Sequence, residues 1–361
     1  MKCCYKVDRF WTTYFVIRLF YLLFSVLIYS KLTTLGDTAS YLSSGLNFSY
    51  EIFTNSTAFM CFLGGISGSF LGGVNILSNF PFTLYSFWII RWTVQKLELR
   101  KYISSNLLMI LLSLPNFCIW TSVCSKELAG LTFSAVYAVL VVNFLKGDYK
   151  IRWRDIGATY LCLLFKPQYF PFVFQGLLYI YIARQWCRSH RSQVFLGLMI
   201  VAADCLLLYH FRELVDLYAG MMYVHFDLAA AESTRDNIFL TAGDFFRHLP
   251  SGMFIGFFGP TLGEMMEKPL FLIAGLESSI ILLLFLFLAG KFVARFFLLG
   301  RISVILFFSY FSIITGICLI HYPFGIFNPG SAIRYRTNFL FLFVIMFMYL
   351  YTSFRKERQY S

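Results

Sequence analysis

Charged residues are scarce in this chain, and their scarcity excludes an ordinary soluble domain. Only 13% of its 361 residues are charged, whereas 59% are hydrophobic. Soluble globular domains carry about 25% charged residues. The composition therefore predicts an integral membrane protein, and we expect one membrane domain covering residues 1–361.

Redox, metal and nucleic-acid motifs are also missing. The nine cysteines form no Cys-x-x-Cys pair, and most lie in apolar runs, where cysteine behaves as a small hydrophobic residue. The net charge of +12 forms no basic stripe alternating with aromatics, so nucleic acid is not expected as a partner. No internal repeat is found either.

What fills the chain instead is a series of apolar runs separated by short basic segments. A helix needs about 20 apolar residues to cross a bilayer. We predict an all-α polytopic membrane protein with about ten transmembrane helices, at residues 10–30, 80–94, 103–120, 128–145, 156–165, 169–183, 194–210, 269–290, 302–320 and 339–353. The glycine-rich stretch 61–79 is interpreted as a re-entrant or interfacial segment, because glycine weakens an isolated helix.

The placement of lysine and arginine predicts the orientation. Cytoplasmic loops carry an excess of these residues. Two thirds of the 30 basic residues fall in segments that this topology places inside, so both termini are expected to be cytoplasmic. Arg18 lies within the first span, and nine basic residues lie outside: Lys31, Lys126, Lys166, Arg212, Arg235, Arg247, Lys268, Arg334 and Arg336.

The only long polar run covers residues 212–268 and is placed outside. Runs of this length are either functional or disordered, and its aromatic content argues against disorder. We interpret it as a partly helical extracytoplasmic lid over a site at one membrane face. A solvated connector is the alternative.

Several outside charges are candidates for function because they break the rule that places the others. Asp37, after the first span, is either the N-cap of a short helix or a general base. Lys126 stands unfavourably at a helix N-terminus, which a bound phosphate would explain, and the compensating Glu127 beside it is the alternative explanation. Lys166 stands at a hinge before Pro167.

Arg334 and Arg336 give the strongest single signal. They are separated by one residue and are expected on an outer loop shaped by Pro329 and Gly330. Two arginines suit an oligophosphate better than two lysines would. The carboxylates Asp204 and Glu277 fall within spans, where pairing with a neighbouring helix is expected.

At these residues the chain resembles the polytopic bacterial polysaccharide polymerases of the O-antigen (Wzy-type) and exopolysaccharide (EpsG-type) group, and more broadly the GT-C membrane glycosyltransferases. The segments that carry the resemblance are 36–41, 115–127, 258–260 and 330–335. The resemblance implies a GT-C-like fold in the bacterial inner membrane and polymerisation of polyprenyl-diphosphate-linked oligosaccharides on the outer face. The resemblance also implies a chain-length regulator protein as a partner. No cofactor is expected.

The resemblance makes Asp37 the acidic residue of the first loop, which would deprotonate the acceptor. We expect Lys126, Arg334 and Arg336 to bind the diphosphate, with Glu127, Lys166, Arg235 and Arg247 completing the substrate site. No Asp-x-Asp or Glu-x-Asp pair marks a metal site. The polyprenyl tail is expected to enter near residues 64–73. The alternatives are a single-sugar transferase that uses a polyprenyl-phosphate sugar and a lipid-linked saccharide transporter; a membrane protein without chemistry ranks third.

Overall fold

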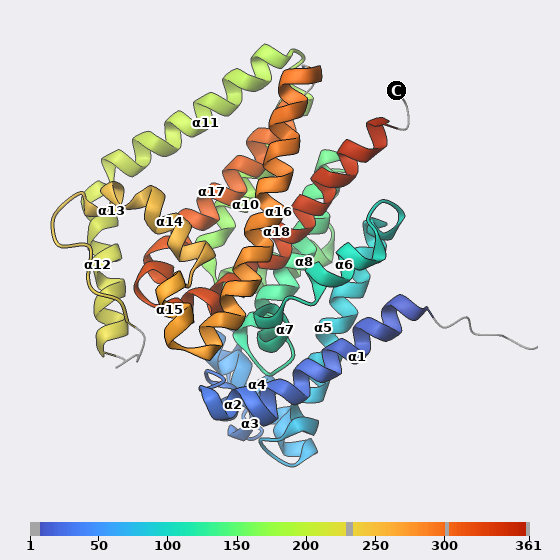
Figure 1. The fold of residues 1–361 in the computed structure, drawn as a ribbon, viewed down its shortest axis with the longest axis vertical. Helices are drawn as coiled ribbons and strands as arrows, with labels where there is room; N and C mark the ends of the chain where they lie inside the picture. The colour runs from blue at the N-terminus through green and yellow to red at the C-terminus, as the bar shows by residue number, and fades with distance from the viewer. Residues whose placement is uncertain (1–7, 229–233, 300–302, 359–361) are drawn as a thin grey trace, which may run out of the picture. The chain divides into compact units, whose positions relative to one another are not determined.

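The computed structural model describes residues 8–228, 234–299 and 303–358, and every regular element in these ranges is helical (Figure 1). Three of the basic residues that the predicted topology places inside, Lys2, Lys6 and Arg301, lie outside the described residues. The all-α prediction is confirmed for the described part. Six of its helices are long and apolar enough to cross a membrane: Arg9–Leu32, Lys126–Leu145, His190–His210, Pro269–Ala294, Val304–Phe327 and Pro329–Ser353.

The chain divides into two compact units. Unit 1 comprises Met1–Val139, Arg154–Lys166 and Thr337–Ser361, and unit 2 comprises Leu140–Trp153 and Pro167–Arg336. Each unit is described by itself below.

Unit 1 begins with α1 (Arg9–Phe24), which continues through a π-helical turn, Ser25–Tyr29, into α2 (Ser30–Leu32). Next come α3 (Thr38–Ser43), α4 (Ser56–Leu71) and α5 (Ile76–Lys96). Its remaining helices are α6 (Ser105–Leu112), α7 (Pro115–Thr121), most of α8 (Lys126–Leu145), nearly all of α9 (Trp153–Phe165) and the later part of α18 (Pro329–Arg358).

The glycine-rich stretch forms most of α4 and the turn after it. Gly72 and Gly73 have φ angles of 86° and 85°, a left-handed conformation that ends α4. Within α4, a Cβ on Gly68 would lie 1.9 Å from the Leu42 carbonyl oxygen of α3. Because Gly68 lacks a side chain, the backbone of α3 packs directly on α4.

The prediction of one continuous helix over residues 103–120 is wrong, because two short helices occupy this range. Leu114 is extended, with ψ 128°, and α7 starts at Pro115. Proline disfavours helical backbone in the residue before it and is tolerated in the first turn of a helix. Pro115 therefore ends one helix and starts the next.

Unit 2 contains α10 (Phe170–Gln185), α11 (His190–His210), α12 (Arg212–Leu228), α13 (Asp244–Arg247), α14 (Leu249–Phe258), α15 (Leu262–Glu267), α16 (Pro269–Leu299) and α17 (Val304–Phe327). The described residues of the polar run 212–268 are thus partly helical, as predicted, and α12 leaves the end of α11 at an angle (Figure 1). Phe226 and Phe245 from this run form a buried cluster with Tyr322 and Phe327 of α17. Aromatic packing therefore attaches the run to α17, which excludes a solvated connector.

The outer loop predicted at residues 321–338 is also wrong. The α17 helix continues to Phe327 with Pro323 inside it, and α18 begins at Pro329. Asn328 alone separates the two helices, and its Oδ1 accepts a hydrogen bond of 2.8 Å from the Ser331 backbone N–H. Arg334 and Arg336 therefore lie on a helix rather than on a loop.

Candidate functional site

The candidate site in unit 1 is built on the turn between α7 and α8, residues 121–125, which side chains of other helices hold. The buried guanidinium of Arg18 donates to the Thr121 hydroxyl at 2.9 Å and to the Thr121 carbonyl oxygen at 2.7 Å. The Cys124 N–H donates to Asn79 Oδ1 at 2.9 Å. The backbone just before Lys126 is therefore fixed by α1 and α5.

Asp37 is brought to this same turn by its neighbour. Thr38 Oγ1 donates to the Cys124 carbonyl oxygen at 3.0 Å. Asp37 occupies the N-cap position of α3, but its side chain makes no capping bond to the helix backbone and instead accepts from the Tyr41 hydroxyl at 2.9 Å. Asp37 therefore stands at the N-cap position, as one of the two predictions had it, but its side chain does not form the capping hydrogen bond. The carboxylate is exposed to solvent.

Lys126 connects the turn to the start of α4. Its Nζ donates to Thr57 Oγ1 at 2.8 Å, while the adjacent Glu127 is buried. Two residues along α4, the Phe59 ring contacts Phe165 with centroids 5.6 Å apart, and Lys166 follows immediately. The structure therefore brings the segments that carry Asp37, Lys126, Glu127 and Lys166 together within unit 1.

An apolar cavity of about 560 Å³ opens beside these segments. It runs along the glycine-rich helix from Phe59 to Leu71 and is closed by α5 and by the first turns of α8, from Ser125 to Thr132. Its walls are almost entirely hydrocarbon and aromatic side chains. This cavity lies where sequence reasoning expects the polyprenyl tail to enter, and Lys126 belongs to the helical turn that lines it.

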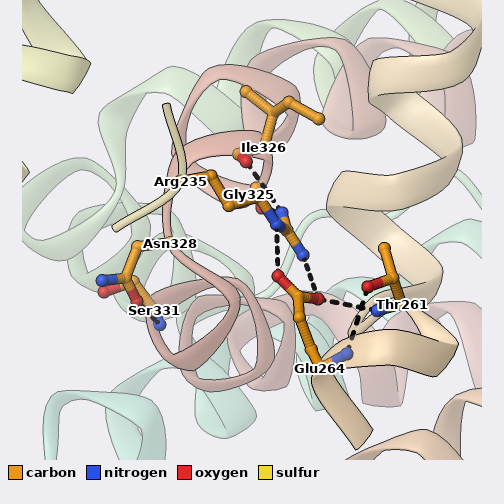
Figure 2. A network of polar contacts seen from close by, with 7 residues as sticks. All are labelled: Arg235, Thr261, Glu264, Gly325, Ile326, Asn328 and Ser331. Carbon is orange, nitrogen blue, oxygen red and sulfur yellow. Dashed lines mark hydrogen bonds and ion pairs between the residues drawn. The ribbon is translucent and has the colours of Figure 1, made fainter. Parts of the chain in front are cut away.

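Arg235 of unit 2 is engaged by other parts of the protein. Figure 2 shows its Nε and Nη2 donating to both carboxylate oxygens of Glu264, at 2.6 and 2.7 Å. Its Nη1 donates to the carbonyl oxygens of Gly325 and Ile326, at 3.0 and 2.7 Å. This two-pronged contact is the strongest arginine–carboxylate geometry. Arg235 thus connects two parts of the polar run, the segment before α13 and α15, and attaches them to the end of α17.

Glu264 carries a pKa that reflects this contact. Burial raises the pKa of Glu264, but the hydrogen bond and charge of Arg235, together with the Thr261 N–H at 2.7 Å, outweigh burial and hold it below the usual range. The carboxylate is consequently ionised at neutral pH. Glu264 and Arg235 therefore form an ion pair of opposite charges.

Arg336 is buried, and both of its terminal nitrogens donate hydrogen bonds within unit 2. Its Nη2 donates to Glu277 Oε1 at 2.8 Å, and its Nη1 donates to the Phe257 carbonyl oxygen and to Ser278 Oγ, both at 2.7 Å. The pairing expected of Glu277 is confirmed. Ser278 Oγ donates in turn to the Gly259 carbonyl oxygen at 2.9 Å. Arg336 and Arg235 therefore hold the two ends of the segment between α14 and α15.

Arg334 and Arg247 are placed differently. Arg334 is half-buried two residues before Arg336 on α18, and side chains two apart on a helix do not share a face. The expected two-arginine clamp is therefore not formed by this helix. Arg247 is exposed and lies 3.5 Å from Asp244. The cavity shared by Asp37 and the arginine pair stays a prediction.

Three polar residues of α5 support the site and were missed by sequence reasoning. Asn79, Thr83 and Ser86 are all buried. Thr83 Oγ1 donates to the Ser122 carbonyl oxygen at 2.6 Å, and Ser86 Oγ accepts from Arg18. Their spacing of four and three residues places them on one helix face. That polar stripe within an apolar run was the available signal.

Six candidate spans and an all-helical architecture in the described residues characterise a multi-pass membrane protein. The same residues contain no group of three or more His, Cys, Asp or Glu that could hold a metal ion. Comparison with protein-family models, curated proteins and solved structures finds no match.

Proposed function

We propose that the chain is a membrane glycosyltransferase that polymerises polyprenyl-diphosphate-linked oligosaccharides at the extracytoplasmic face of a bacterial inner membrane. The ten crossings expected from the sequence belong to this proposal, with α6 and α7 together forming the third. The placement of the polar run 212–268 on the outer side of the membrane also belongs to this proposal.

The observation that carries the proposal is the association of an apolar cavity with a lysine and an exposed carboxylate in unit 1. The cavity of about 560 Å³ suits a hydrocarbon tail, because its walls offer almost no polar atoms. Lys126, in the turn that lines it, supplies a positive charge for a phosphate. Asp37 is held beside the same turn through Thr38.

In the proposed reaction, the oxygen of the acceptor hydroxyl attacks the anomeric carbon of the lipid-linked donor. Asp37 acts as the base and takes the proton of that hydroxyl. The bond between that carbon and the diphosphate oxygen breaks, and the diphosphate leaves on its lipid. Lys126 stabilises the negative charge that develops on the leaving group. Charge stabilisation of this kind is usually the largest single contribution to the rate.

The roles of the other predicted residues are refined accordingly. We assign structural roles to Arg235 and Arg336, since each is held by a carboxylate and by backbone carbonyl groups. Lys166 and Glu127 stay in the proposed substrate site because unit 1 brings their segments to Lys126. Arg334 and Arg247 remain proposed phosphate ligands.

The proposal is tested with purified protein in lipid nanodiscs, supplied with a polyprenyl-diphosphate-linked oligosaccharide. Products longer than one repeat unit are expected from the wild type. Asp37→Asn is expected to abolish elongation, and Lys126→Ala to reduce it by about 100-fold, in the range of removing one group that stabilises a developing negative charge. Lys126→Arg is expected to retain part of the activity.

The matched controls are Glu51→Gln, an exposed carboxylate before α4, and Lys31→Ala, an exposed lysine before α3. Both are expected to elongate normally. Products extended by a single sugar would identify the single-sugar transferase instead. Movement of the substrate across the bilayer without new glycosidic bonds would identify a transporter, and full activity of Asp37→Asn would contradict the assigned base.

A further inference from the structure

Unit 2 contains a second apolar cavity, of about 600 Å³, which is open on one side and lined by α10, α11, α12, α14 and α17. Its volume lies within the range of about 300–1000 Å³ typical of ligand sites. Phe172, Leu208 and Phe311 are among the large apolar side chains in its walls. The proposed glycosyl transfer assigns this cavity no role.

One acid interrupts the apolar wall. Asp204 lies on α11, and its Oδ1 accepts a hydrogen bond of 2.8 Å from Gln175 Nε2. Gln175 Oε1 accepts one of 2.7 Å from Ser312 Oγ. Within the described part of the chain, these are the only hydrogen bonds that Asp204 and Gln175 side chains make. Asp204 there has no cationic partner, and an acid inside a candidate span marks a functional site by default.

The depth of Asp204 indicates which part of a lipid would reach it. The 21 residues of α11 extend over about 31 Å at 1.5 Å per residue, close to the thickness of the hydrocarbon core. Asp204 is six residues before the end of α11 at His210, about 9 Å from that end by the same rise. If α11 crosses the bilayer, Asp204 is about 9 Å from one end of the helix and about 6 Å from its midpoint, below the level of the lipid headgroups.

Charge selects against a phosphate at this position. The residues that line the cavity include no lysine, arginine or histidine. A phosphate beside the Asp204 carboxylate would be repelled, in contrast to the unit 1 cavity with its adjacent Lys126. The carboxylate needs a hydrogen-bond donor, and the second N–H of Gln175 needs an acceptor.

We propose that the unit 2 cavity binds diacylglycerol. Its free hydroxyl donates to Asp204, an ester carbonyl accepts from Gln175, and the acyl chains fill the apolar space. Diacylglycerol combines one donor, nearby carbonyl acceptors, no charge and hydrocarbon chains, which are the features that this cavity requires. The site is independent of the glycosyl transfer proposed above.

The test compares three lipids with identical dioleoyl chains on the purified full-length chain, using native mass spectrometry from detergent. The lipids are diacylglycerol, its methyl ether, which has lost the donor, and phosphatidic acid, which carries a phosphate in place of the hydroxyl. Diacylglycerol is expected to bind at least about tenfold more tightly than the ether, from the strength of a hydrogen bond to a charged group. Phosphatidic acid is expected to bind more weakly still.

Asp204→Asn is expected to remove the preference for diacylglycerol over its ether, and Leu208→Trp to reduce binding of both by filling the cavity. Asp236→Asn, an exposed acid of unit 2, is the matched control and keeps the preference. Equal binding of diacylglycerol and its ether to the wild type would mean that bulk lipid chains occupy the cavity without selection. That result, preferential binding of phosphatidic acid, or an unchanged preference in Asp204→Asn would each overturn the proposal, and the wild-type series decides it even if a variant fails to fold.

Discussion

Arg336 and Glu277 form an ion pair of 2.8 Å in which both side chains are almost completely buried. Taking one partner away leaves an unpaired charge in a low-dielectric environment, which costs about 3–5 kcal/mol in buried pairs. We therefore expect Arg336→Met to lower the stability of the protein by that amount.

The double variant Arg336→Met with Glu277→Met is expected to recover much of the loss, because replacing both charges with apolar groups is often neutral. Unfolding in detergent micelles, followed by circular dichroism, measures both variants. A stable but inactive Arg336→Met protein would contradict the structural role and restore Arg336 to the phosphate site.

Glu264 gives the stability of the protein a dependence on acidity. Its folded pKa lies below its unfolded value of about 4.3, so the Arg235 contact contributes fully above that value. The contribution is lost as pH falls through the lower, folded pKa. Glu264→Gln is expected to lower the melting temperature at pH 7 and to approach the wild type in strong acid. Glu267→Gln, exposed on the same helix, is the control, and a constant difference at every pH would refute the assignment.

The glycines of α4 and α9 predict opposite effects of the same substitution. Gly68→Ala places a methyl group 1.9 Å from the Leu42 carbonyl oxygen, a backbone atom that cannot move aside easily. We expect a destabilisation of about 1–3 kcal/mol, typical of an overpacked core. Gly157→Ala, in the interior of α9 with nothing within 4 Å, is expected to stabilise by up to about 1 kcal/mol. Equal melting temperatures of the two variants would contradict direct packing of α3 on α4.

Sequence reasoning located the long apolar helices because their signal is local. The predicted spans 194–210 and 269–290 each fall within one observed helix, and α17 contains residues 304–320 of the predicted span 302–320. Proline caused the errors. Pro115 divides an expected span, whereas Pro323 lies inside α17 and Pro329 starts α18, where a loop was expected. The same residue type thus ends, interrupts or begins a helix according to contacts that a single sequence does not specify.

The candidate site was less predictable than the helices, because its contacts join residues that are far apart in the sequence. Arg235 and Arg336 stood out as cations on the wrong side, but their partners Glu264 and Glu277 lie 29 and 59 residues away. Long-range pairing of this kind depends on how helices pack, so an unusual charge was visible in the sequence while its partner was not. The spacing of the polar residues of α5 could be read from the sequence. Their role in supporting the site could not, because it depends on their contacts with the turn between α7 and α8.

The buried Arg18 has a consequence for how the chain is made. Its hydrogen-bond partners Ser86 and Thr121 lie 68 and 103 residues further along the chain. A ribosome adds about 5–20 residues per second, so α1 waits on the order of 5–20 s for Thr121 to be synthesised. An arginine at the centre of an inserting helix costs about 2.5–3.5 kcal/mol during that wait. The first helix is therefore expected to be poorly retained in the bilayer alone, and to be stabilised there only when α7 with Thr121 has been made.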